Sequence, residues 1–67
     1  MGVIIIREMV GTSSESWSDA ARQAVKTASR TVRNIKTIDV VSQSARVEDG
    51  EVVEYRVDLK ISFEYDG

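Results

Sequence analysis

The sequence contains no cysteine and no histidine among its 67 residues. The lack of cysteine excludes disulfide bonds and a thiol nucleophile, and the lack of both residue types excludes a zinc knuckle. Without histidine there is also no imidazole that acts as a base near neutral pH or activates a serine hydroxyl. We therefore do not expect an enzyme, and oligomerisation remains the common way to stabilise so small a core.

Long apolar runs are also missing. The run Val3–Ile6 is closed by Arg7 and Glu8, so we expect neither a signal peptide nor a membrane span. These absences favour a cytoplasmic location. The net charge of -2 and the pI near 5.0 argue against extensive binding to nucleic acid or to anionic membranes, because both require concentrated positive charge.

The end of the sequence predicts one long β-strand. Every second position there is apolar: Val53, Tyr55, Val57, Leu59, Ile61, Phe63 and Tyr65. Such a strand spans roughly 40 Å, whereas a compact domain of this length has a radius of gyration of about 11 Å. The strand must therefore bend, or another copy of the chain must cover part of it.

The start of the sequence predicts a strand followed by a helix. Val3–Val10 is rich in β-branched residues and is followed by Gly11, which we interpret as the end of the strand. Thr12 and Glu15 fit a capping box for the helix. Ser13 and Ser14 are the alternative caps.

The helix is predicted to continue for about five turns to Asn34. Its apolar residues recur at steps of three and four: Trp17, Ala20, Ala21, Ala24, Val25, Ala28, Val32 and Ile35. The opposite side carries a basic row: Arg22, Lys26, Arg30 and Arg33. This row is either a solvated face that also stabilises the helix dipole or a surface that contacts phosphates.

A hairpin is predicted to follow, with Lys36–Glu48 joined to the last strand by the turn Asp49-Gly50. The expected pairs are Glu48 with Glu51, Val47 with Val52, Gln43 with Arg56, Asp39 with Lys60, and Ile38 with Ile61. This register places Ile38 and Val40 under the helix. Nearer the turn it places Ser42, Ser44 and Arg46 beside Val57, Tyr55 and Val53. A bulge near Ser42–Ser44 would exchange the two faces beyond it.

The predicted fold is a single α+β domain over residues 1–67 with the order β-α-β-β. No catalytic site is evident in it. Four acidic residues gather at the hairpin: Glu48, Asp49, Glu51 and Glu54. They are either solvated turn residues or calcium ligands shared across a subunit boundary. Trp17 is predicted to be a core or interface anchor.

The sequence resembles the dodecins over nearly its whole length. The resemblance rests on Val10-Gly-Thr-Ser13, Val32-Arg-Asn-Ile35, Asp39-Val-Val41 and the strand from Tyr55 to Phe63. It implies a helix held by a curved antiparallel sheet, and a hollow homododecamer with trimers as building units.

Typical dodecins bind flavins such as riboflavin or FMN in pairs, between tryptophans and with a glutamine that hydrogen-bonds to the ring. The pocket positions implied by the resemblance are Thr37, Arg46, Tyr55 and Arg56. Thr37 stands where the stacking tryptophan would be, and Arg56 stands where the glutamine would be. Threonine has no aromatic face, so we expect a degenerate flavin site.

Ser16-Trp17 and Tyr55-Arg56 are similar to the branch called calcium dodecin. That resemblance implies calcium between subunits, with ligands that the sequence does not assign. Arg46 and Arg56 near a symmetry axis would instead repel calcium and attract an anion. Both alternatives stay open.

We therefore expect a non-enzymatic cage that stores a small ligand or an ion, with no nucleic-acid or membrane partner. The alternative is an interaction protein that binds a macromolecular partner through the basic row.

Overall fold

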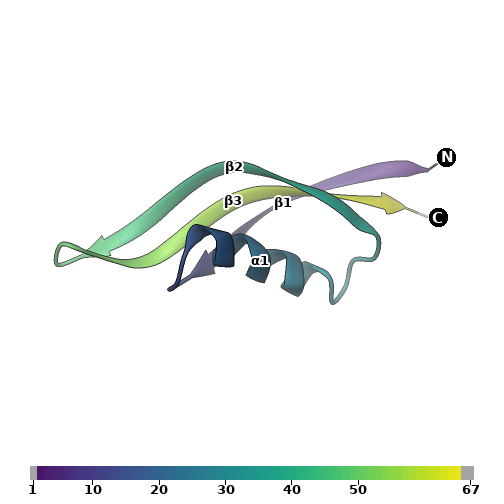
Figure 1. Cartoon of the computed structure of the whole chain (residues 1–67). Coiled ribbons are helices and arrows are strands. Elements are labelled where there is room, and N and C mark those ends of the chain that lie inside the picture. The colour runs from purple at the N-terminus through teal and green to yellow at the C-terminus, as the bar shows by residue number, and fades with distance from the viewer. Residues whose placement is uncertain (1, 66–67) are drawn as a thin grey trace.

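The computed structural model describes residues 2–65. It contains strand β1 (Val3–Ser13), helix α1 (Trp17–Ala28), strand β2 (Ile35–Glu48) and strand β3 (Glu51–Tyr65). The strands form one antiparallel sheet in the order β1-β3-β2, and α1 lies along one face of it (Figure 1). This is the predicted α+β arrangement. We call the sheet face toward α1 the inner face and the opposite one the outer face. No helix in the described part of the chain is long and apolar enough to cross a membrane.

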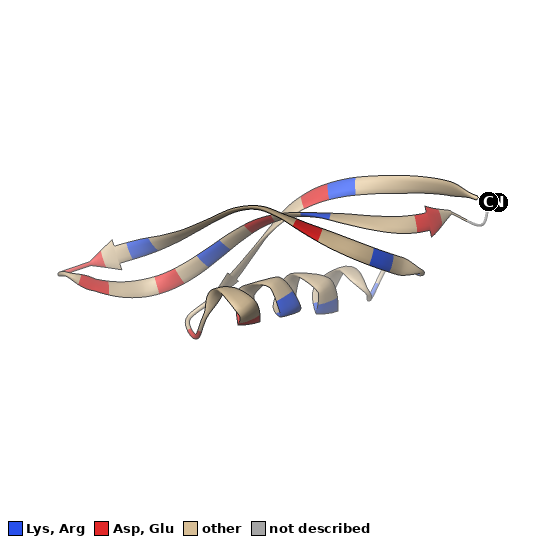
Figure 2. Ribbon diagram, turned by 45° about the horizontal axis from the view of Figure 1, so that its top comes forward, with Lys and Arg blue, Asp and Glu red and all other residues tan. Residues whose placement is uncertain are grey.

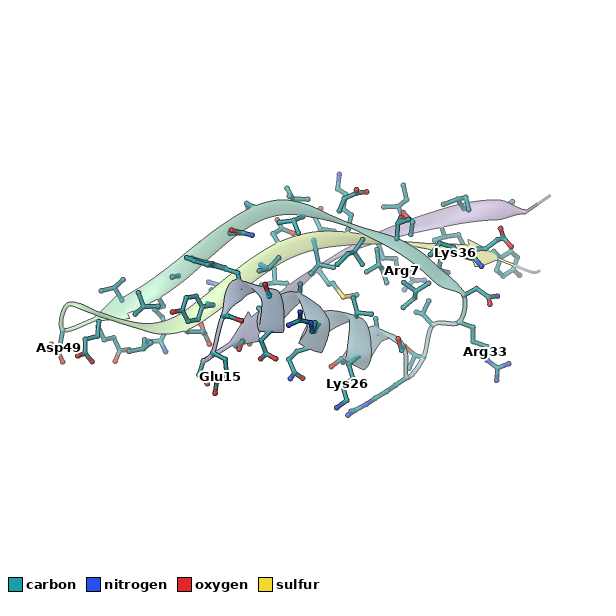
Figure 3. The ribbon with its side chains drawn as sticks, viewed as in Figure 1. Arg7, Glu15, Lys26, Arg33, Lys36 and Asp49 are labelled. Carbon is teal, nitrogen blue, oxygen red and sulfur yellow. The ribbon has the colours of Figure 1, made fainter. Side chains whose placement is uncertain are left out.

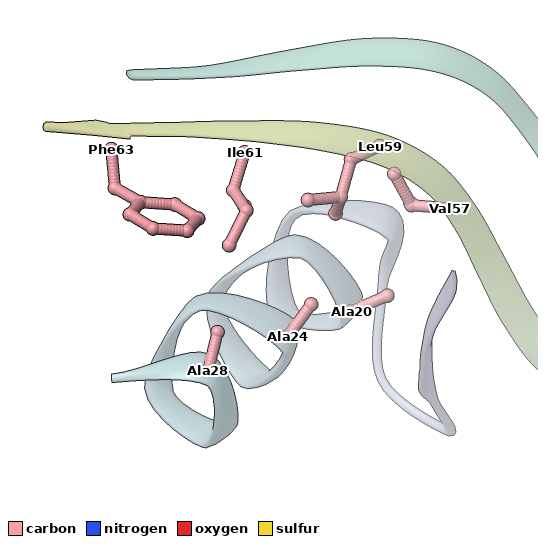
Figure 4. Close-up of a cluster of buried hydrophobic side chains, with 7 residues drawn as sticks. All are labelled: Ala20, Ala24, Ala28, Val57, Leu59, Ile61 and Phe63. Carbon is pink, nitrogen blue, oxygen red and sulfur yellow. The ribbon is translucent and has the colours of Figure 1, made fainter. Parts of the chain in front are cut away.

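The core lies between α1 and β3. Ala20, Ala24 and Ala28 recur every fourth residue and point toward the strand (Figure 4). They meet alternate side chains of β3: Val57, Leu59, Ile61 and Phe63. All seven are at most 9% exposed, and removing such apolar surface from water is the main favourable contribution to folding.

Gly11 sets how closely the helix approaches the sheet. A Cβ at this position would lie 2.2 Å from the carbonyl oxygen of Ala20 and 2.9 Å from the Cβ of Ala24. Only glycine fits such a contact. Gly11 does not end the strand, as the sequence suggested, because β1 continues to pair with β3 as far as Ser13.

The helix begins at a different cap from the predicted one. The Ser16 side chain accepts a hydrogen bond from the Asp19 backbone N–H at 2.9 Å. The predicted capping box of Thr12 and Glu15 is wrong because Thr12 still belongs to the β1 ladder. Ser13 stabilises the start of the helix in another way, because its hydroxyl donates a hydrogen bond to the Asp19 carboxylate at 2.6 Å.

The helix also ends earlier than predicted, at Ala28 and not at Asn34. The Thr31 N–H donates to the Ala28 carbonyl at 3.1 Å, a three-residue step that tightens the chain into a turn. Asn34 has a positive φ of 62° and redirects the chain into β2. Val32 and Ile35 still pack against the core, so the apolar spacing identified core residues but not their secondary structure.

The predicted hairpin is confirmed at both of its ends. Asp49 and Gly50 have positive φ angles of 53° and 78°, as a type I′ turn requires. The confirmed pairs are Glu48 with Glu51, Val47 with Val52, Asp39 with Lys60, and Ile38 with Ile61.

The middle of the predicted register is wrong because two bulges lie between those ends. The register shifts between Arg46 and Val47, and again between Val40 and Ser42. The first shift adds a residue on β3 and the second adds one on β2, so they cancel. Gln43 therefore lies opposite Val57.

Between the two bulges, the residues of β2 face the opposite side of the sheet from the predicted one. Ala45 lies opposite Tyr55 and Ser44 lies opposite Arg56, so the inner face receives Gln43 and Ala45. The predicted placement of Ser42, Ser44 and Arg46 beside Val57, Tyr55 and Val53 is wrong. These three residues lie on the outer face, because paired residues of adjacent strands share a face.

The sheet is longer than the helix that covers it. The chain measures 51 × 20 × 13 Å with a radius of gyration of 13.7 Å, and the hairpin projects beyond α1 (Figure 1). α1 packs mainly on β1 and β3. Ile38 and Val40 on β2 are therefore 37% and 49% exposed, and the prediction that they pack under the helix is wrong.

We predict that Gly11→Ala destabilises the protein by about 1–3 kcal/mol, because the new methyl group must displace the helix backbone. Thermal unfolding measures this effect. Gly2→Ala is the matched control, because a Cβ there lies 3.1 Å from the flexible Glu64 side chain and at an ordinary contact distance of 3.5 Å from the Tyr65 carbonyl oxygen. Equal melting temperatures for the two variants would contradict the close helix contact.

Candidate functional site

The four positions of the expected ligand pocket lie on two faces of the sheet. Arg46 lies opposite Glu54, and Thr37 lies opposite Ser62. Together with Arg56 they belong to the outer face, because alternate residues of β3 share a side. Tyr55 lies on the inner face, against the start of α1.

One chain does not bring these positions together. Thr37 pairs six residues along β3 from Arg56, which corresponds to about 20 Å of extended strand. Among the described residues, one open groove of about 610 Å³ lies between the segment after α1 and the ends of β1 and β3, and another of about 510 Å³ lies between α1 and β1. Neither is lined by Thr37, Arg46, Tyr55 or Arg56. A pocket that uses these four residues therefore requires more than one chain.

Trp17 and Tyr55 are held by each other and by β2. Their rings meet edge to face, with centroids 4.9 Å apart and planes at 77°. The Trp17 indole N–H donates to the Ser44 carbonyl at 2.9 Å, and the residue remains 38% exposed. The sequence did not predict this contact between the helix and β2.

Arg46 is engaged by the acidic hairpin. Its guanidinium forms an ion pair with Glu48 and lies 3.7 Å from Glu54. The Arg46 side chain is 53% exposed, so these pairs contribute little to stability. They do reduce the positive charge that Arg46 offers to an anion. Arg56 is exposed and forms no ion pair with any other residue from 2 to 65.

A group of charges lies at the centre of the outer face. Glu8 on β1 and Asp39 on β2 both lie opposite Lys60 of β3. Asp58 precedes Lys60 by two residues and lies on the same face of β3. Figure 2 shows these alternating signs along the sheet. The sequence predicted only the Asp39–Lys60 pair of this group, because nothing in it indicated which strand β1 would join.

Glu8 and Asp58 interact directly. A hydrogen bond with the Asp58 carboxyl, and then its negative charge, raise the pKa of Glu8 above its ordinary value, and Lys60 partly opposes this. Asp58 Oδ1 is buried and has no hydrogen-bond partner within the described chain.

The residues present do not fit a flavin or a metal within one chain. Thr37 offers no aromatic ring, and the rings of Trp17 and Tyr55 pack edge to face against each other. Among residues 2–65, no group of three or more carboxylates is close enough to hold a metal ion. The hairpin acids lie at the end of the molecule, where Asp49 projects away from the core (Figure 3).

A family model and a known relative of similar sequence point to the same protein family. A model of the Dodecin family matches residues 3–66. Calcium dodecin of Mycobacterium tuberculosis is 35% identical over 63 residues, which cover 94% of this chain and 89% of that protein.

Solved structures agree with the sequence matches. Dodecin from Streptomyces coelicolor superposes with a TM-score of 0.96 at 33% identity, covering 98% of this chain and 94% of that one. Calcium dodecin from M. tuberculosis superposes with a TM-score of 0.83 at 34% identity, covering 94% and 90%.

We predict that Glu8→Gln makes the protein more stable than wild type at pH 7 and that this gain disappears near pH 4. The raised pKa of Glu8 means that its folded form binds a proton more tightly than the unfolded form. Stability therefore falls as the pH rises above the ordinary value of 4.5. Thermal unfolding at several pH values measures the effect.

The control for this prediction is Glu64→Gln, which removes a carboxylate from the far end of the same sheet face. A gain that is equal in both variants, or that persists at pH 4, would show that the Glu8–Asp58 contact is not its cause.

Proposed function

This chain belongs to the dodecin family, and we propose that it is a non-enzymatic binding protein that assembles into a hollow homododecamer. The cage stores or buffers a small ligand or an ion in the cytoplasm. Its flavin site is degenerate. The observation that carries the proposal is the dispersal of the pocket positions in one chain, which leaves a site only between chains.

Assembly is supported by the apolar surface that one chain leaves uncovered. Among residues 2–65, large apolar side chains that are exposed outnumber those that are buried. Apart from Trp17 and Tyr65, they lie on β1, on β2 and at the hairpin: Val3, Ile4, Ile6, Val10, Ile38, Val40, Val41, Val47 and Val52. Such extensive exposed apolar surface typically marks an interface.

The ligand differs from a flavin held between aromatic rings. With Thr37 in place of tryptophan, the cage loses a stacking contribution of about 1–3 kcal/mol per contact, by analogy with base stacking. Arg56 replaces the neutral glutamine with a charge that favours an anion. The Arg56 charge and the partly neutralised Arg46 together suit a small anionic ligand bound between chains.

Calcium is the second candidate ligand. The relative from M. tuberculosis is named calcium dodecin, and its structure is described as calcium chelating with a novel calcium-binding site. Carboxylates from two copies would have to combine between chains, since residues 2–65 of one copy contain no group of three that could hold a metal ion. The charges of Glu48 and Glu54 are already shared with Arg46.

We expect wild-type protein to leave riboflavin fluorescence unquenched and the double variant Thr37→Trp, Arg56→Gln to quench it. Restoring the ring should tighten binding by on the order of tenfold to a hundredfold. Fluorescence titration of both proteins tests this expectation.

Thr31→Trp is the control for the titration, because it adds an exposed indole in the turn after α1, which contains none of the four pocket positions. Strong quenching by wild type would contradict the degenerate site. Quenching by Thr31→Trp equal to that of the double variant would show that any added indole suffices.

A further inference from the structure

The basic row is a continuous exposed surface on the side of α1 away from the sheet. Arg22, Lys26 and Arg30 follow each other at four-residue steps, and Arg33 continues the row in the segment before β2; all four are exposed. Figure 2 shows this basic side of the helix, and Figure 3 shows Lys26 and Arg33 pointing away from the sheet. Along a helix, four residues correspond to a rise of about 6 Å.

Folding does not account for this row. No ion pair within residues 2–65 involves any of its members. Of the four, only Lys26 lies in the last turn of α1, where a cation stabilises the helix dipole. Arg22 lies in the middle of the helix, and Arg30 and Arg33 lie beyond its end. The row is also a local exception in a chain whose net charge is -2.

The spacing of the row matches an extended acidic polypeptide. In an extended strand, every second side chain points the same way, so alternate carboxylates repeat at about 6.8 Å. The guanidinium groups of Arg22, Arg30 and Arg33 fit carboxylates through paired hydrogen bonds.

Two features disfavour a nucleic acid as the partner. Single-stranded nucleic acid is usually bound by cations with aromatic side chains between them, and the sequence from Arg22 to Arg33 contains no aromatic residue. A long polyanion would also meet the net negative charge of the rest of the chain. We therefore propose that the basic row binds an acidic, extended segment of a partner protein, a role separate from ligand storage in the cage.

The test is a fluorescence anisotropy titration of the assembled wild-type protein with a labelled twelve-residue peptide of alternating glutamate and serine. We expect binding at low salt that weakens steeply as salt screens the contacts. We expect no binding of the same peptide with glutamine in place of glutamate. Both peptides are titrated against the wild-type protein, so this comparison does not depend on the folding of a variant. Absence of binding to the glutamate peptide, or equal binding to both peptides, would overturn the proposal.

The location of the site is tested with two matched lysine variants. Lys26 and Lys36 are both exposed, but only Lys26 belongs to the row. We expect Lys26→Gln to weaken peptide binding several-fold and Lys36→Gln to leave it unchanged. The triple variant Arg22→Gln, Lys26→Gln, Arg30→Gln should weaken it on the order of tenfold, since each exposed pair contributes little alone.

Glutamine keeps a good helix propensity, so these variants should remain folded and assembled, which circular dichroism and sedimentation verify. Equal weakening by Lys26→Gln and Lys36→Gln would overturn the proposal, because it would indicate general charge attraction. Tighter binding of a single-stranded oligothymidylate than of the glutamate peptide would overturn it in favour of a nucleic-acid partner.

Discussion

The close contact between Gly11 and the helix determines most of what the rest of the molecule does. Because Gly11 has no side chain, Ala20 and Ala24 rest directly on β1, and the helix is held over β1 and β3. β2 lies on the far side of β3, so most of its inner face is left uncovered by its own helix. The exposed Ile38 and Val40 follow from this geometry, and an assembly that covers them is the simplest way to complete the fold.

The two bulges in the hairpin have the second largest effect. They cancel in number, so the flanking pairs, Val47 with Val52 and Val40 with Leu59, are those of a regular hairpin, but the segment between the bulges faces the opposite side of the sheet. This places Arg46 on the same face as Arg56. The outer-face position of Arg46 is a product of these local irregularities.

The sequence was most informative where one pattern depends on one local interaction. Alternation predicted β3, and the Asp49-Gly50 turn predicted the hairpin and the register near it. The sequence left open a bulge near Ser42–Ser44 but could not locate it, because the apolar pattern of β2 is weak there; the structure has it between Val40 and Ser42. It also overestimated the length of α1, since Val32 and Ile35 reach the same core from outside the helix. The resemblance to dodecins was confirmed, while the pocket assignment of Thr37, Arg46, Tyr55 and Arg56 stays a prediction that depends on neighbouring chains.

Native mass spectrometry of the purified protein shows directly whether the chains assemble, and the proposed site exists only between chains. We expect a dominant species at twelve times the chain mass of 7.5 kDa, with any added mass belonging to the bound ligand. A protein that remains a monomer or dimer at micromolar concentration would contradict it, since a single chain then would have to be stable with its β2 face and hairpin exposed.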